Sequence, residues 1–158
     1  MLICVYMKIF ALPLLLGIYA LGAEPTVEQQ QERYEHGAAS CVEVLKAQEE
    51  ALLKELIDCP LPLIEVEGDN PLEAYMQILM LQGEASQQDV QKAQEDWLRL
   101  LQMGVVLRGL QPCDKLTALQ KNLQEQQQLA QKKADAGVGN KLELLIAKAK
   151  LAAWFNTH

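Results

Sequence analysis

The pattern that most restricts the fold of this chain occurs three times. It reads GAASCVEVLKAQ at residues 37–48, GEASQQDVQKAQ at residues 83–94 and, in a looser copy, GVGNKLELLIAK at residues 137–148. The shared form is G-x-x-[SN]-x-x-[DE]-[VL]-x-x-A-[QK], and its glycines lie 46 and then 54 residues apart (83−37 and 137−83). Recurrence of this form at such a period indicates an internal repeat with a change of length.

Each recurrent position of the repeat has a role in ending one helix and starting the next. Glycine adopts the left-handed conformation just past a helix end at no steric cost. Ser or Asn three residues later is a favoured N-cap, and Asp or Glu three residues further on completes a capping box. So short a link makes the two helices antiparallel neighbours, so the pattern predicts three helical hairpins. The alternative is three ordinary helical turns that look alike by chance in a chain rich in Gln, Ala and Leu.

Residues 1–23 have the layout of a secretory signal peptide. Lys8 precedes an apolar run at residues 9–21, and the small residues Gly22 and Ala23 offer cleavage points. The alternative is a retained membrane anchor, but the run is short for a span, which needs about 20 residues. We therefore expect cleavage near residue 23, and we expect the remaining residues, 24–158, to form one helical-hairpin domain.

The composition of the chain after the signal peptide favours an all-α fold. Ala, Leu, Gln, Glu and Lys dominate, as in long helices and coiled coils, whereas Val, Ile and Thr are too sparse for an extensive sheet. With Lys8 removed the formal charge is 13 − 21 = −8, which argues against a nucleic-acid partner because such a partner needs a basic patch. No second apolar stretch is long enough to span a membrane, so we expect no span after cleavage.

The prolines and turn residues between the repeats mark the ends of the hairpins. The predicted hairpins cover residues of about 24–58, 71–108 and 114–157, although the helix signal fades over residues 103–110. Asn70 and Asp114 are the predicted N-caps of the helices that follow the two connectors. Three hairpins in series place the glycine turns at one pole of the molecule and the connectors at the other.

The cysteines fit this arrangement in an oxidising compartment. Cys59 and Cys113 both lie in connectors, and therefore at the same pole, whereas Cys41 follows the first turn. We therefore predict a Cys59–Cys113 disulfide, with Cys41 left buried or paired between chains.

The first copy of the repeat resembles the periplasmic tip of the TolC-like outer-membrane efflux protein family. In that family antiparallel coiled-coil hairpins turn at [YF]-x-x-G-x-x-[ST]-x-x-[DE]-[VL]-x-x-A, and YEHGAASCVEVLKA at residues 34–47 fits this form. The other two copies fit from the glycine onward but lack the aromatic residue. The match covers the hairpin ends, about half of the chain after the signal peptide.

The resemblance implies a contact surface at the hairpin tips, because the family's tips contact the adaptor of an efflux pump. The residues that would lie in or beside this surface are Gly37, Ser40, Gly83, Ser86, Gly137 and Asn140. This chain departs from the family in having three hairpins where the family has two. Its connectors are also too short for the barrel strands that separate the family's hairpins, so the resemblance does not imply that this chain forms the family's channel.

Motifs of enzymatic chemistry are missing from the sequence. It has no glycine-rich phosphate loop and no nucleophile elbow. Its histidines are His36, beside a turn, and His158. A metal site at His36 and Cys41 would need one or two further ligands, so a solvated turn histidine is favoured. We therefore predict no catalytic residues, no metal site and no cofactor.

Three functional hypotheses follow from the sequence. The first is a non-enzymatic secreted or periplasmic interaction protein of the cell envelope, which docks its capped turns onto a protein partner. That partner would be an efflux-type adaptor or a second copy of the chain. The second hypothesis is the periplasmic part of an efflux or export channel assembly associated with the outer membrane. The third is a small metal-binding or hydrolytic secreted protein.

Overall fold

The computed structural model describes residues 26–37 and 40–156. The predicted signal peptide and its cleavage point lie outside these described residues. So does residue 24, where the predicted hairpin domain begins.

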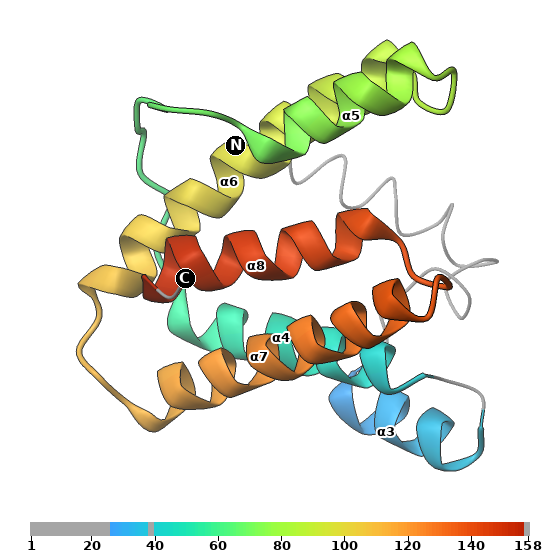
Figure 1. Ribbon diagram of the computed structural model, residues 1–158. Coiled ribbons are helices and arrows are strands. Elements are labelled where there is room, and N and C mark those ends of the chain that lie inside the picture. The colour runs from blue at the N-terminus through green and yellow to red at the C-terminus, as the bar shows by residue number, and fades with distance from the viewer. Residues whose placement is uncertain (1–25, 38–39, 157–158) are drawn as a thin grey trace, which may run out of the picture.

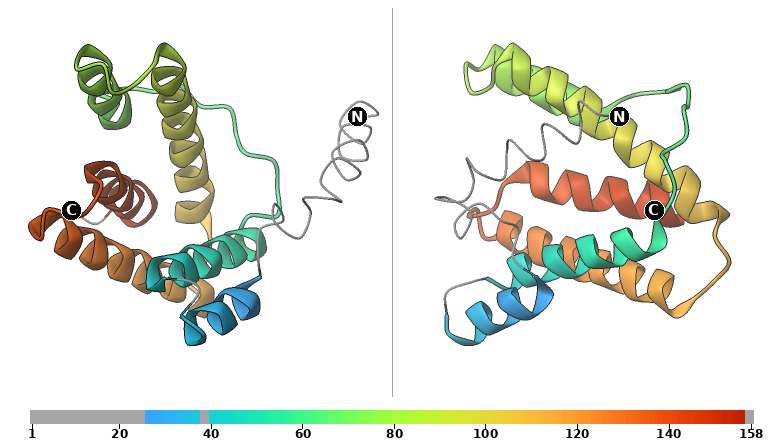
Figure 2. Two further views of the ribbon diagram at one scale, coloured as in Figure 1. Left: turned by 90° about the vertical axis from the view of Figure 1, so that its right-hand side faces the viewer. Right: turned by 180° about the vertical axis from the view of Figure 1, so that it is seen from behind.

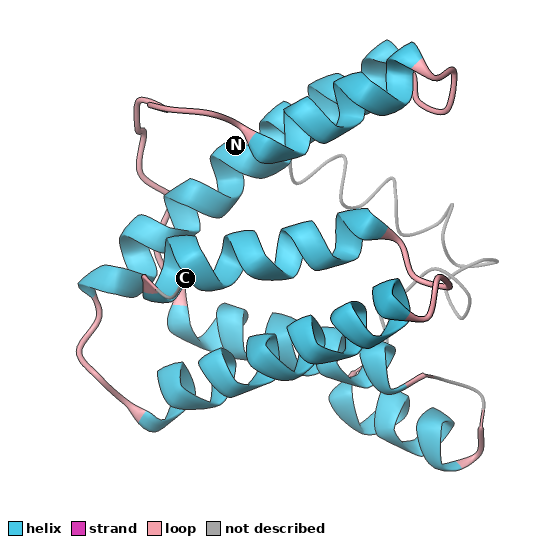
Figure 3. Ribbon diagram, viewed as in Figure 1, coloured by secondary structure: helices cyan, strands magenta, loops and turns pink. Residues whose placement is uncertain are grey.

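Six helices lie in the described part of the chain, paired as three antiparallel hairpins (Figure 1). They are α3 (Val27–Glu35), α4 (Cys41–Leu56), α5 (Pro71–Leu81), α6 (Gln87–Gly109), α7 (Asp114–Asp135) and α8 (Lys141–Phe155). The segments between them are loops, and no strand occurs among the described residues (Figure 3). The all-α fold with three helical hairpins, predicted from the repeat, is confirmed.

The three turns lie at one pole of the molecule. In Figure 1 they are on the right, and the two connectors, residues 57–70 and 110–113, are on the left. The hairpins diverge toward their turns, so that the α5–α6 turn stands well apart from the other two (Figure 2). The turns therefore face the same way as separate projections and do not form one continuous tip.

A shared core makes the three hairpins one bundle. Its buried residues come from α4, α6, α7 and α8, and they are Leu56, Leu100, Leu107, Leu119, Leu123, Ala149, Leu151 and Trp154. Leu119 and Leu123 are fully buried. They belong to the 3-4 spaced apolar seam that the sequence gives α7. Trp154 combines burial with a hydrogen bond from its Nε1 to the carbonyl oxygen of Leu100, 2.9 Å away, which links α8 to α6.

One of the predicted helix ends is wrong. The end of α6 at Gly109 agrees with the predicted hairpin boundary near residue 108, although the helix signal fades from residue 103. At the start of α7 the N-cap is Cys113, whose side chain makes no capping bond, and Asp114 is already helical, so the predicted cap at Asp114 is wrong. Asn70 caps α5 as predicted, since its Oδ1 accepts hydrogen bonds from the amides of Leu72 and Glu73.

Buried polar groups join α4, α7 and α8. Glu49 is only 5% exposed. Its carboxylate accepts a hydrogen bond from Gln126 Nε2 at 2.8 Å and forms an ion pair with Lys150 Nζ. Asn122 Nδ2 donates to the carbonyl oxygen of Leu45 at 2.9 Å. A slip of α7 along α4 would leave these buried groups without partners, which costs more than the bonds contribute. The polar groups therefore fix the register of the two helices.

Candidate functional site

The glycine of each turn ends its helix in the way the repeat predicts. Gly37, Gly83 and Gly137 have φ angles of 73°, 77° and 73°, in the left-handed region. The amide of each donates to the carbonyl three residues earlier at 3.0 Å. At Glu84 and Val138 the amide donates to the carbonyl five residues earlier, which completes a Schellman motif. A side chain at these glycines would be strained by the backbone, although space for it exists.

Two of the turns contain the predicted capping box. The Ser40 amide donates to Glu43 Oε2 at 2.6 Å, and the Glu43 amide donates to Ser40 Oγ at 3.3 Å. The Ser86 amide donates to Asp89 Oδ2 at 2.7 Å, and the Asp89 amide donates to Ser86 Oγ at 3.3 Å. These reciprocal bonds hold the start of α4 and the start of α6 in one geometry.

The third turn is capped without a box, so this part of the prediction is wrong. Asn140 Oδ1 accepts from the amide of Leu142 at 2.9 Å. The carboxylate of Glu143 makes no bond back to Asn140 and instead lies 3.9 Å from Lys46 Nζ on α4. The cause is that Asn140 caps the second helical amide, while the carboxylate is drawn to a cation of the neighbouring hairpin.

The capping boxes lower the pKa of two exposed carboxyl groups. The hydrogen bond from the backbone amide of Ser40 is the main cause of the lowered pKa of Glu43. The hydrogen bond from the backbone amide of Ser86 is the main cause of the lowered pKa of Asp89. Both bonds favour the ionised form, since a carboxylate accepts an N–H bond that the protonated acid accepts less well.

These shifts predict a specific acid sensitivity. A carboxyl group whose pKa is lower in the folded state contributes stability above its unfolded value of about 4 and loses it as the pH falls through the folded value. In the double variant Glu43→Gln, Asp89→Asn each amide oxygen still accepts the serine N–H but does not titrate. We expect the drop in melting temperature between pH 7 and pH 3, followed by circular dichroism, to be smaller in the variant. An identical drop would contradict the prediction.

Exposed apolar side chains mark all three turns. Tyr34 is 46% exposed, Leu81 86% and Val138 78%, and each lies within three residues of a turn glycine. Ile78, at 54%, lies one turn of α5 further back. Of these residues only Tyr34 belongs to the sequence pattern, as the aromatic residue of the first turn. The exposure of the others is not readable from the sequence, because it depends on which faces the neighbouring hairpins cover. These exposed apolar side chains lie at the same pole of the molecule as the N-caps of the three turns.

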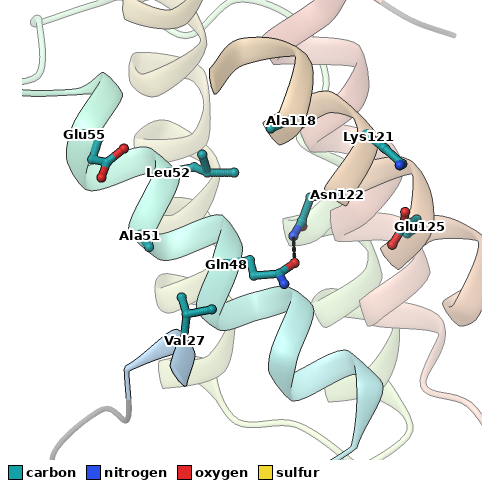
Figure 4. A pocket seen from close by; sticks show the side chains of 9 residues that line it. All are labelled: Val27, Gln48, Ala51, Leu52, Glu55, Ala118, Lys121, Asn122 and Glu125. Atoms are coloured by element: carbon teal, nitrogen blue, oxygen red, sulfur yellow. Dashed lines mark hydrogen bonds between the residues drawn. The ribbon is translucent and has the colours of Figure 1, made fainter. Parts of the chain in front are cut away.

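A groove runs between α3, α4 and α7 on another face of the molecule (Figure 4). It encloses about 420 Å³. Its apolar residues are Val27, Ala51, Leu52 and Ala118, and its polar residues are Gln48, Glu55, Lys121, Asn122 and Glu125. The bond from Asn122 Nδ2 to Gln48 Oε1, 3.3 Å long, crosses it. The groove combines apolar contact area with charges of both signs and holds no nucleophile paired with a base.

A second cavity, of about 310 Å³, lies between α4, α5, α6 and α8. Leu53, Leu100 and Trp154 supply apolar walls. The paired Glu49 and Lys150 supply charge, and the ammonium of Lys150 lies 5.5 Å from the centre of the Trp154 ring. Glu49 and Lys150 satisfy each other, and the cation–π contact further stabilises the ammonium of Lys150. Asp96 and Arg99 also line this cavity.

No cluster of three or more His, Cys, Asp or Glu side chains suited to a metal ion occurs in the described ranges, 26–37 and 40–156. Cys41, Cys59 and Cys113 are free and exposed thiols, so the structure does not contain the predicted Cys59–Cys113 bond. The Lys115–Glu55 ion pair, 3.1 Å long, holds the start of α7 beside the end of α4. These helix ends lead directly into the two cysteines, and the disulfide stays a prediction.

The disulfide prediction has a direct test. The protein is purified without reductant from an oxidising compartment, labelled with iodoacetamide and mapped by mass spectrometry. We expect label on Cys41 and a linked peptide that joins Cys59 to Cys113, because the Lys115–Glu55 ion pair links the two helix ends that lead into these cysteines. Label on Cys59 and Cys113 would show that the bond does not form.

Among the residues that the structure describes, no helix is both long enough and apolar enough to cross a membrane. Comparison of the chain with protein-family models, with curated proteins and with solved structures finds no match.

Proposed function

We propose that this chain is a non-enzymatic interaction protein of the cell envelope, secreted or periplasmic, that docks through its three capped turns onto a helical hairpin of a partner protein. The observation that carries the proposal is the coincidence of rigid capping with exposed apolar side chains. Tyr34, Leu81 and Val138 project at three turns that share one pole.

Rigid turns are suited to recognition because they lower the cost of ordering a surface on binding. The left-handed glycines fix the end of one helix of each hairpin, and the N-caps Ser40, Ser86 and Asn140 fix the start of the next, before any partner arrives. The apolar side chains beside them are then presented at set positions. A partner that buries them gains about 25 cal/mol for each Å² of apolar surface removed from water.

The kind of partner is suggested by the form of the first turn. Residues 34–47 resemble the tip sequence of TolC-like efflux proteins, whose partners are the helical hairpins of adaptors. An adaptor-like hairpin would lie against the turns with its own apolar residues between the projections. The three hairpins diverge toward their turns, so that the turns are separate projections for such an element to contact (Figure 2).

Photo-crosslinking in cells tests the proposal. A photo-reactive residue is placed at Tyr34, Glu84 or Val138, one site in each turn region. The control site is Leu63, which is 98% exposed and lies in a connector at the opposite pole. We expect the turn sites to capture the same envelope protein and the control site not to capture it. Capture of nothing specific at the turns, or of the same protein from Leu63, would overturn the proposal.

A further inference from the structure

Helix α5 has far more apolar surface than the fold buries. Of its eleven residues, Pro71–Leu81, the large apolar side chains are Leu72, Tyr75, Met76, Ile78, Leu79, Met80 and Leu81. Only Leu72 is buried, at 3% exposed. Among the described helices it packs mainly on α6 and less extensively on α8, at the outer edge of the bundle (Figure 1). Most of its apolar surface is therefore left partly or fully open to solvent.

The exposed part of this surface has the spacing of a helix-packing seam. Ala74, Ile78 and Leu81 are separated by four and then three residues, which places them on one side of a helix with 3.6 residues per turn. All three are exposed, Ile78 at 54% and Leu81 at 86%. We call these three residues the α5 stripe. Such a stripe is what a second helix would cover, since a 3-4 spaced seam matches the seam of a helix laid along it.

The charged residues of the hairpin that flank the α5 stripe in the sequence are mostly acidic. Residues 71–86 contain Glu73 and Glu84 and no Lys or Arg. The next ten residues, 87–96, add Asp89, Glu95 and Asp96 against the single cation Lys92. A partner with basic residues beside its apolar seam would therefore find complementary charge, whereas an acidic partner would be repelled.

We propose that the α5 stripe binds an amphipathic helix of a partner protein that has a 3-4 spaced apolar seam flanked by Lys or Arg. This inference rests on the proposed function and deepens it, because it assigns one hairpin a side surface and gives the partner a chemistry. A second copy of the chain fits less well, since two paired α5 helices, parallel or antiparallel, would bring the acidic Glu73 and Glu84 of one copy near those of the other.

Three fluorescent peptides test the inference by anisotropy with the purified protein. The first is an amphipathic helix with a leucine seam flanked by lysines. The second keeps the seam and replaces lysine with glutamate. The third has the composition of the first, with its leucines spread around the helix. We expect the first to bind at least about tenfold more tightly than either of the others, since about 1.4 kcal/mol corresponds to tenfold in affinity.

Variants of the protein locate the binding. The pair Ile78→Asp, Leu81→Asp places charge on exposed positions that make no core contact, and it should weaken binding of the first peptide at least about tenfold. Leu63→Asp, at an equally exposed apolar residue in the connector, should leave binding unchanged. Glu84→Lys should weaken the lysine peptide and strengthen the glutamate peptide.

The other outcomes are decisive as well. Equal binding of the first and third peptides would show attraction by charge alone and would overturn the inference. Binding that survives the Ile78, Leu81 change would do the same. A dimer of the free protein in analytical ultracentrifugation, dissociated by that change, would show that a second copy covers the stripe.

Crosslinking at the turns without peptide binding would overturn this inference alone. Peptide binding without crosslinking at Tyr34 and Val138 would overturn the docking of the turns alone.

Discussion

Replacing Lys150 with methionine is expected to lower the free energy of unfolding by about 2–4 kcal/mol, near the range for breaking a buried ion pair from one side. The Glu49 carboxylate is 5% exposed, and Lys150 Nζ is the only cation paired with it in the described structure. Without that cation a charge would stay buried, with Gln126 as its remaining hydrogen-bond donor. Denaturation in urea, followed by circular dichroism, measures the change.

Two further variants make this prediction specific to burial. The double variant Glu49→Gln, Lys150→Met removes the charge with its partner and should recover most of the lost stability, because no uncompensated ion remains. Lys115→Met breaks the exposed pair with Glu55, whose side chains are more than half exposed, and should cost less than about 1 kcal/mol. A double variant as unstable as Lys150→Met would show that the loss comes from packing and not from the buried charge.

Gly104→Ala is expected to destabilise the protein by about 1–2 kcal/mol, although alanine is the better helix former by up to about 1 kcal/mol. A Cβ atom on Gly104 would lie 2.8 Å from the carbonyl oxygen of Ala153 and 3.2 Å from Cδ1 of Trp154. The first of these neighbours is backbone, so α6 and α8 would have to separate. The Ala153 carbonyl also accepts a hydrogen bond from Arg108 at 2.8 Å, which the separation would strain.

Gly109 provides the control within the same helix. It is the last residue of α6, and a Cβ atom there would meet nothing within 4 Å. Gly109→Ala should therefore leave stability unchanged or raise it by up to about 1 kcal/mol. The difference between the two glycine variants, measured by urea denaturation, isolates the close approach of α6 and α8. Equal effects of the two changes would mean that the contact at Gly104 relaxes without cost.

Gly104 also contributes to the weak helix signal over residues 103–110. Two glycines and two valines lower the intrinsic preference for helix in this segment, so the helix signal fades there. In the structure α6 continues because this segment packs on α8 around Trp154. The buried Leu107, 2% exposed, contributes to the same contact. Tertiary packing outweighs local preference here.

The turns were predictable because capping is local. A glycine, a Ser or Asn three residues later and an acid three residues further on act within one short segment, and their bonds need no other part of the chain. The glycines and the N-caps are therefore confirmed in all three copies. The one failure is Glu143, whose carboxylate lies toward Lys46 in a different hairpin. Nothing within the repeat itself signals that contact.

The sequence alone determined that this protein is all-α, that its helices pair as three hairpins and that each turn is closed by glycine and capped by Ser or Asn. Periodicity and short links are properties of neighbouring residues, so they survive without knowledge of the fold. Only the tertiary structure decided that Glu49 pairs with Lys150, 101 residues away, and that Ile78 and Leu81 remain exposed. Both depend on which faces of distant helices meet, because burial is a property of the packed bundle and not of any one segment.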